Sequence, residues 1–104
     1  MLYISYWEIN PDYDPSELAE IAMDLMKKKV YPAEGINEIG FYMSLSDHWG
    51  ITIEEADSEE ALIRNTQMWR ISKPGMIKLI KSTPAMEVAK MLPVVMKLKK
   101  EIKG

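Results

Sequence analysis

Residues 36–56 read INEIGFYMSLSDHWGITIEEA, and this stretch decides how the rest of the chain can fold. Apolar residues occupy alternate positions in two runs that are joined by the short connection 46–50, which is typical of two β-strands joined by a tight turn. One alternating set is strongly apolar: Ile39, Phe41, Met43, Leu45, Trp49, Ile51 and Ile53. The other set is mixed: Gly40, Tyr42, Ser44, Ser46, Gly50, Thr52 and Glu54. The two faces of this hairpin are therefore expected to meet different surroundings.

The composition limits the classes of protein to which the chain can belong. Its 104 residues suit one domain, residues 1–104, and 47% hydrophobic residues can supply a core. A net charge of −3 gives no reason to expect nucleic-acid binding, and the absence of cysteine excludes disulfides and thiolate chemistry. Neither a signal peptide nor a membrane span is recognised, so we expect a cytoplasmic protein with no membrane partner. No cofactor is expected.

Segments on either side of the hairpin supply two more strands and three helices. Residues 1–9 and 76–82 read as strands. The segment from Asp14 to the lysines at 27–29 reads as a helix, with Asp14 as its cap and a capping box completed by Glu17. Asp57 is the expected cap of a second helix that breaks at residues 73–75. A third helix is expected from Thr83 and Pro84 onward, with a kink or break at Pro93.

The resulting order is β-α-β-β-α-β followed by a C-terminal helix, which fits an α+β, ferredoxin-like fold with an antiparallel four-stranded sheet and helices on one face. We expect the helices to cover the following residues: Leu2, Ile4, Tyr6, Phe41, Met43, Ile51, Ile53, Ile77 and Leu79. The open face would then carry this set: Tyr3, Ser5, Trp7, Tyr42, Ser44, Thr52, Glu54, Met76, Lys78 and Ile80. Such a face is too aromatic for water and too polar for a core, so a two-fold homodimer enclosing a cavity between its sheets is expected.

Several local features carry a resemblance to a known superfamily. They are Trp49-Gly50 at the start of the return strand, the helix start 57–61, Trp69 late in the second helix, and the joint at residues 81–85. With the short first strand, they make the chain resemble the dimeric α/β-barrel superfamily of ferredoxin-like folds, and within it the small single-domain proteins of archaea and bacteria. The resemblance covers most of the chain. It implies a homodimer or a higher homo-oligomer and implies no particular reaction.

Two side chains are candidates for proton transfer. Glu54 falls on the mixed face of the hairpin, where burial in a dimer would raise its pKa and suit it to proton abstraction. An interfacial salt bridge or a solvated position is the alternative for Glu54. His48 is the only histidine and lies in the hairpin turn, where it could act as a general base or a haem ligand. A plain polar turn residue is the alternative for His48.

A second group of residues could contact a ligand. The candidate ligand-binding residues are Tyr3, Trp7, Tyr42, Ser44 and Thr52. The three aromatic members have polar tips and could stack on a planar molecule, although packing in a dimer would explain them equally well. The chain contains no phosphate-binding loop, nucleophile elbow or metal-ligand spacing.

Three functions remain open on this basis. The first is a homodimeric module that binds a small planar or apolar molecule between its subunits. The second is a cofactor-independent isomerase or monooxygenase that uses Glu54 and His48 for proton transfer and Tyr42 to orient its substrate. The third is a structural or partner-binding homo-oligomer without a ligand. Fold resemblance alone does not choose among them.

Overall fold

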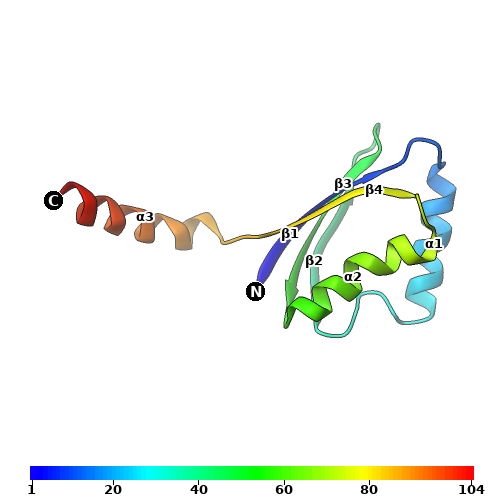
Figure 1. Cartoon of the computed structure of the whole chain (residues 1–104), viewed down its shortest axis with the longest axis horizontal. Helices are drawn as coiled ribbons and strands as arrows, with labels where there is room; N and C mark the ends of the chain where they lie inside the picture. Colours follow the sequence, from blue (N-terminus) through cyan, green and yellow to red (C-terminus); the bar gives the residue numbers. More distant parts are fainter.

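The fold is α+β, and the computed structural model describes residues 1–104. Its elements are β1 (Leu2–Ile9), α1 (Pro15–Lys27), β2 (Ile36–Met43), β3 (Trp49–Ala56), α2 (Glu59–Ser72), β4 (Ile77–Pro84) and α3 (Val88–Lys103). The four strands form one antiparallel sheet in the order β2-β3-β1-β4. Helices α1 and α2 lie on one side of this sheet, and α3 extends away from them (Figure 1). No helix has the length and apolar character that a membrane crossing requires.

The first two helices begin where polar side chains satisfy free backbone N–H groups. Asp14 caps α1 by accepting hydrogen bonds from the backbone of Ser16 and Glu17, and the Glu17 side chain completes the predicted capping box. The cap of α2 is Ser58, which accepts from the backbone N–H of Ala61 at 3.1 Å, so the prediction of Asp57 was wrong by one residue. A serine hydroxyl performs this capping as well as a carboxylate does.

The prediction of which sheet face the helices cover was wrong for the two central strands. In β1, Ser5, Trp7 and Ile9 are buried beneath the helices, while Ile4 is exposed on the other face. In β3, Thr52 and Glu54 are likewise buried, and Ile51 and Ile53 are on the open face. Because β1 is apolar on both sides, its pattern does not choose a face, and the larger Trp7 ring is the one that packs under the helices.

The edge strand β4 agrees with the prediction only in part. Its pairing with β1 shifts between Glu8 and Ile9, and Ile77 pairs with Ile9 and packs against the core, as predicted. Beyond the shift, Ile80 pairs with Trp7 and also packs against the core, whereas Leu79 pairs with Glu8. Leu79 and Ile80 therefore lie on the faces opposite to those predicted. Met76, just before the strand, was also expected on the open face but is completely buried.

An irregularity in β2 explains why part of the prediction still holds. The register between β2 and β3 shifts between Glu38 and Gly40, which leaves Ile39 without a partner. After the shift Phe41 pairs with Thr52 and Tyr42 pairs with Ile51. Phe41 and Met43 therefore lie on the helix-covered side, as predicted, but opposite to the side that holds Ile51 and Ile53. The turn between β2 and β3 spans residues 44–48 rather than 46–50.

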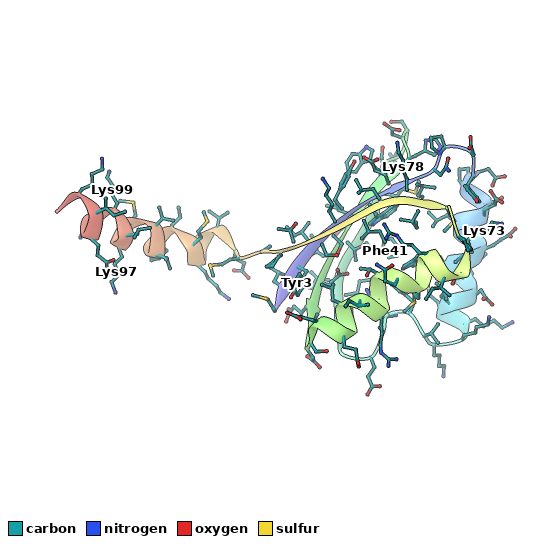
Figure 2. The ribbon with its side chains drawn as sticks, in the orientation of Figure 1. Tyr3, Phe41, Lys73, Lys78, Lys97 and Lys99 are labelled. Atoms are coloured by element: carbon teal, nitrogen blue, oxygen red, sulfur yellow. The ribbon has the colours of Figure 1, made fainter.

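The hydrophobic core lies between the helix-covered face of the sheet and the two helices. Its buried members are Trp7, Ile9, Leu25, Tyr31, Trp69 and Met76. Phe41 packs against this cluster, and Figure 2 shows its side chain in the space between the sheet and α2. A pocket lies in this region and is lined by four of its aromatic side chains, Trp7, Tyr31, Phe41 and Trp69.

The C-terminal part departs most from the prediction. Thr83 and Pro84 do not start a helix but continue β4, pairing with Ile4 and Tyr3 of β1. Proline is tolerated there because β4 is an edge strand, which leaves one side without a neighbour to receive an N–H bond. The helix α3 begins only at Val88 and continues through Pro93 without the expected break. Every residue of α3 is exposed.

Candidate functional site

A pocket opens between the sheet and the helices within a single chain. It has a volume of about 40 Å³, which is space for a few water-sized occupants. Its apolar wall is formed by Trp7, Leu18, Tyr31, Phe41, Trp69, Ile77 and Ile80. Its polar groups come from Ser5, Thr52, Glu54, Asn65 and Thr66. A mainly apolar cavity with a few converging polar groups is the usual form of a small-molecule site.

The carboxyl group of Glu54 is the most unusual feature of this pocket. The residue is only 1% exposed. It has no lysine, arginine or histidine within ion-pair distance. Burial raises the pKa of Glu54, the charge of nearby Glu38 raises it further, and hydrogen bonds from Ser5 and Asn65 act in the opposite direction. The net direction is upward, so Glu54 holds its proton to a higher pH than an exposed glutamate does.

Two serines connect Glu54 to the edge strand of the sheet. The Oγ of Ser5 lies 2.6 Å from Oε1 of Glu54 and 2.7 Å from the Oγ of Ser82 on β4. When Glu54 is ionised, Ser5 donates to the carboxylate and can accept from Ser82. When Glu54 is protonated, its O–H can donate to Ser5, and Ser5 can then donate to Ser82. The three side chains form a continuous path along which a proton could be passed.

A tyrosine and a second glutamate form a hydrogen-bonded pair close to Glu54. The hydroxyl of Tyr31 donates a short hydrogen bond to Oε1 of Glu38, which sits across the ladder from Glu54. Burial raises the pKa of Tyr31, and the hydrogen bond to Glu38 and the charges of Glu38 and Glu54 raise it further. Tyr31 therefore remains a neutral donor across the physiological pH range. This arrangement holds Glu38 in place beside the pocket.

The two arms of the Asn65 side chain fix α2 against the rest of the site. Its Oδ1 accepts from the backbone N–H of Ala33 at 2.8 Å, and its Nδ2 lies 3.5 Å from Oε2 of Glu54. The second contact is long, so it orients the carboxyl group weakly. Asn65 thereby connects α2, the segment before β2 and the pocket carboxyl in one buried network.

The aromatic wall is held by edge-to-face contacts. The Trp69 ring meets Tyr31 at a centroid distance of 5.1 Å and Phe41 at 6.0 Å, and Trp7 meets Phe41 at 5.9 Å. The indole N–H of Trp7 donates to Oγ1 of Thr52 at 3.1 Å. Thr52 thus accepts one bond and keeps its own hydroxyl proton to donate to an occupant of the pocket.

The structure brings together three of the predicted site residues. Glu54, Trp7 and Thr52 all line the pocket. Their position beneath the helices, however, means that they do not line a cavity at the open face, where the sequence placed them. The site that they form lies within one chain.

The other four predicted residues lie elsewhere. Tyr42 is on the open face and is 59% exposed. Ser44 lies beyond the end of β2, and Tyr3 lies at the start of β1 beside Glu54 without lining the pocket. His48 is in the exposed turn, with its Nδ1 3.8 Å from Oδ1 of Asp47, and does not approach Glu54. No group of three or more His, Cys, Asp or Glu side chains converges to form a metal-binding set.

Sequence reasoning missed several polar members of the site. Ser5 lies on the same face of β1 as Tyr3 and Trp7, and the sequence placed all three on the open face; a lone serine also gives no sign of a carboxyl partner. Asn65 does carry a signal, because it interrupts the otherwise apolar inward stripe of α2. Ser82 and Tyr31 give none, since both reach the site only through the fold.

Comparison with known protein families gives a match that covers nearly the whole chain. The family described as "Domain of unknown function (DUF3303)" matches residues 1–99. No curated protein matches the sequence.

Proposed function

The chain belongs to the DUF3303 family, and we propose that it binds a small, mainly apolar molecule in the pocket between its sheet and its helices. The observation that carries this proposal is the carboxyl group of Glu54, which is buried against the pocket without a cation to neutralise it. A buried carboxyl of this kind costs stability, and a ligand that hydrogen-bonds to it would offset that cost.

The lining of the pocket supports a particular class of ligand. The walls offer indole, phenol and phenyl rings from Trp7, Tyr31, Phe41 and Trp69, which favour a planar or apolar body. Glu54 and Thr52 offer one carboxyl group and one hydroxyl donor at the same wall. We therefore propose a small planar ligand with a single polar group directed at these two residues. Because the free volume is small, the surrounding rings must move apart to admit it.

A second candidate function is proton transfer without a cofactor, of the isomerase or monooxygenase kind. The observation that favours it is the path Glu54–Ser5–Ser82, which joins the carboxyl in the pocket to the edge of the sheet. A glutamate with a raised pKa is a stronger base than an exposed one, so it can take a proton from a bound carbon acid and return it at another atom. In this scheme Glu54 is the catalytic residue and Ser5 positions it.

The assembly is part of the proposal. The strand order and the β-α-β-β-α-β succession support a ferredoxin-like fold, and the resemblance to dimeric α/β barrels supports a homodimer. The open face supports it too, because it presents Ile4, Ile51, Ile53 and Tyr42 without any covering layer. The absence of cysteine from the chain supports a cytoplasmic location.

The binding proposal is tested by a thermal-shift screen against small phenols, aryl ketones and aryl carboxamides. We expect some of these compounds to raise the melting temperature of the wild-type protein and to lose most of that effect with Glu54→Gln or Thr52→Val. A His48→Gln variant is the matched control, because His48 lies outside the pocket and its loss should leave binding unchanged. A ligand-induced rise in melting temperature that is as large in Glu54→Gln and in Thr52→Val as in the wild type would contradict the proposed site.

Binding and catalysis are separated by deuterium exchange into a bound ketone. If Glu54 transfers protons, a bound aryl ketone should exchange its α-hydrogens with D₂O faster in wild-type protein than in Glu54→Gln. If the wild type and Glu54→Gln both bind the ketone and exchange its α-hydrogens at the same rate, the protein is a binding module and the catalytic candidate is removed. No binding by any compound, in a protein that remains folded, would instead favour a structural homo-oligomer.

A further inference from the structure

Helix α3 is an amphipathic arm that no other part of the chain covers. It extends from the end of β4 away from the rest of the molecule (Figure 1). One stripe of the helix is apolar and consists of Val88, Met91, Leu92, Val95, Leu98 and Ile102. Each of these side chains is exposed. A helix with such a stripe normally gains its stability by packing the stripe against another element.

The connection to the arm directs it away from its own domain. The backbone N–H of Ala85 donates to the carbonyl of Leu2 at 2.9 Å, so the ladder with β1 extends past the end of β4. Only Met86 and Glu87 separate that bond from α3, and Glu87 has an extended backbone with φ −58° and ψ 137°. The chain therefore continues in the direction of the strand instead of turning back over the sheet.

A second uncovered apolar surface lies on the same chain. The two central strands, β1 and β3, present an apolar stripe on the open face of the sheet. Its members are Leu2, Ile4, Tyr6, Trp49, Ile51 and Ile53. A sheet with helices on one face and an apolar stripe on the other needs a further layer on that side. Each copy of the chain thus supplies one uncovered arm and one uncovered sheet face.

The arm and the rest of the chain carry opposite net charges. Residues 88–103 contain five lysines and one glutamate, a net charge of +4. The whole chain has a net charge of −3, so the remainder carries −7. Figure 2 shows Lys97 and Lys99 on the arm, remote from that acidic remainder. A basic arm that its own acidic domain does not contact is suited to contact the acidic domain of another copy.

We infer that α3 packs its apolar stripe against the open sheet face of a second copy, and that the second copy's arm does the same in return. This reciprocal exchange covers both uncovered surfaces with one two-fold assembly. It also brings the lysines of each arm to an acidic partner. The exchange rests on the proposed homodimer and not on the pocket, whose residues lie on the opposite side of the sheet.

Hydrogen exchange measured at low and high micromolar concentration tests this inference on the full-length chain. An isolated 16-residue helix with an internal proline is marginally stable, so α3 should exchange fast in a monomer. We expect the amides of α3 and of the central strands to become protected together as concentration rises. The molecular mass in solution should double over the same range.

Two variants that add the same charge provide the matched comparison. Val95→Lys places a charge in the apolar stripe of the arm and should weaken dimerisation roughly tenfold or more. Ile71→Lys places the same side chain at an exposed apolar position of α2, 78% exposed, and should leave dimerisation unchanged. Added salt should also weaken the wild-type dimer, because the arm and the domain attract each other electrostatically.

Several results would overturn the inference. A dimer whose α3 amides stay unprotected would mean that the sheets associate without the arm. Protection of α3 in the monomer would mean that the arm packs on its own domain. Protection that appears only on vesicles of anionic phospholipid would assign the arm to a membrane surface. Equal effects of Val95→Lys and Ile71→Lys would remove the apolar stripe from the interface.

Discussion

The hydroxyl of Ser5 donates a 2.6 Å hydrogen bond to the carboxyl of Glu54, and no positive charge lies within ion-pair distance to share that role. Ser5 on β1 and Glu54 on β3 are both almost completely buried beneath the helices. Burial raises the pKa of Glu54, the only carboxyl that lines the pocket, and the bond from Ser5 opposes that rise. Both the stability and the proposed chemistry of the protein depend on this balance.

The pH dependence of stability should carry the signature of Glu54. The folded state holds this proton above the ordinary pKa of 4.5, so between 4.5 and its raised folded value the folded state binds more protons than the unfolded state. Its contribution to stability is therefore complete below pH 4.5 and is lost as the pH rises through the folded pKa. Each tenfold difference in proton affinity between the two states corresponds to about 1.4 kcal/mol. Urea unfolding of wild type and Glu54→Gln across pH 4–8 should show that this fall is absent from the variant. Parallel curves would contradict the raised pKa.

Removing the hydroxyl of Ser5 should lower stability and raise the pKa of Glu54 further. The bond from Ser5 favours the ionised form, so Ser5→Ala leaves a buried carboxyl without its best donor. We expect a loss of about 1–3 kcal/mol in the free energy of unfolding at pH 7. Ser46→Ala, in the exposed hairpin turn, is the control and should change stability by less than about 0.5 kcal/mol. Equal losses in both variants would count against the buried network.

The aromatic wall should be the most sensitive part of the core. Trp69 is buried and meets both Tyr31 and Phe41 edge to face. Trp69→Ala should lower the free energy of unfolding by about 3–5 kcal/mol through the cavity that it leaves. Ile71→Ala, two residues further along α2 on its exposed side, should cost less than about 0.5 kcal/mol. Chemical denaturation of both variants compares the two sides of the same helix directly.

Gly50 should tolerate no side chain. A Cβ atom at this position would overlap the Trp7 ring and the backbone carbonyl of Tyr42. Gly50→Ala must therefore displace Trp7 from the pocket wall, at a cost of about 1–3 kcal/mol. The near-ultraviolet circular dichroism of the tryptophans should change with the loss of stability. An unchanged spectrum together with an unchanged melting temperature would contradict this close contact.

Much of the architecture follows from local sequence signals. Turn and capping residues predict the capping box from Asp14 to Glu17 and the end of α2 at Ser72. Alternation of apolar and polar residues predicts the two strands of the hairpin. Both kinds of signal depend on neighbouring residues only. The same signals did not reveal that Pro84 ends a strand, because its position beside Tyr3 depends on a pairing across the whole chain.

The orientation of the sheet shows a different limit. Side chains alternate with a period of two, so a change of one residue in the hairpin register reverses which face is covered. The apolar set containing Phe41 and Ile51 looked continuous through the turn, but pairing places Phe41 beside Thr52. The choice depends on how Trp7, Phe41 and Trp69 fit together, which is a property of three distant segments. Glu54 was therefore identified as a candidate for the wrong side of the sheet.

The most direct test of the proposed pocket chemistry is the titration of the Glu54 carboxyl itself. The side-chain ¹³C shifts of glutamate report protonation, and the signal lost in Glu54→Gln assigns the residue. We predict a midpoint clearly above 4.5, which moves higher still in Ser5→Ala. A midpoint at or below 4.5 would show that Glu54 is ionised like an exposed glutamate and would contradict the pocket chemistry proposed for it.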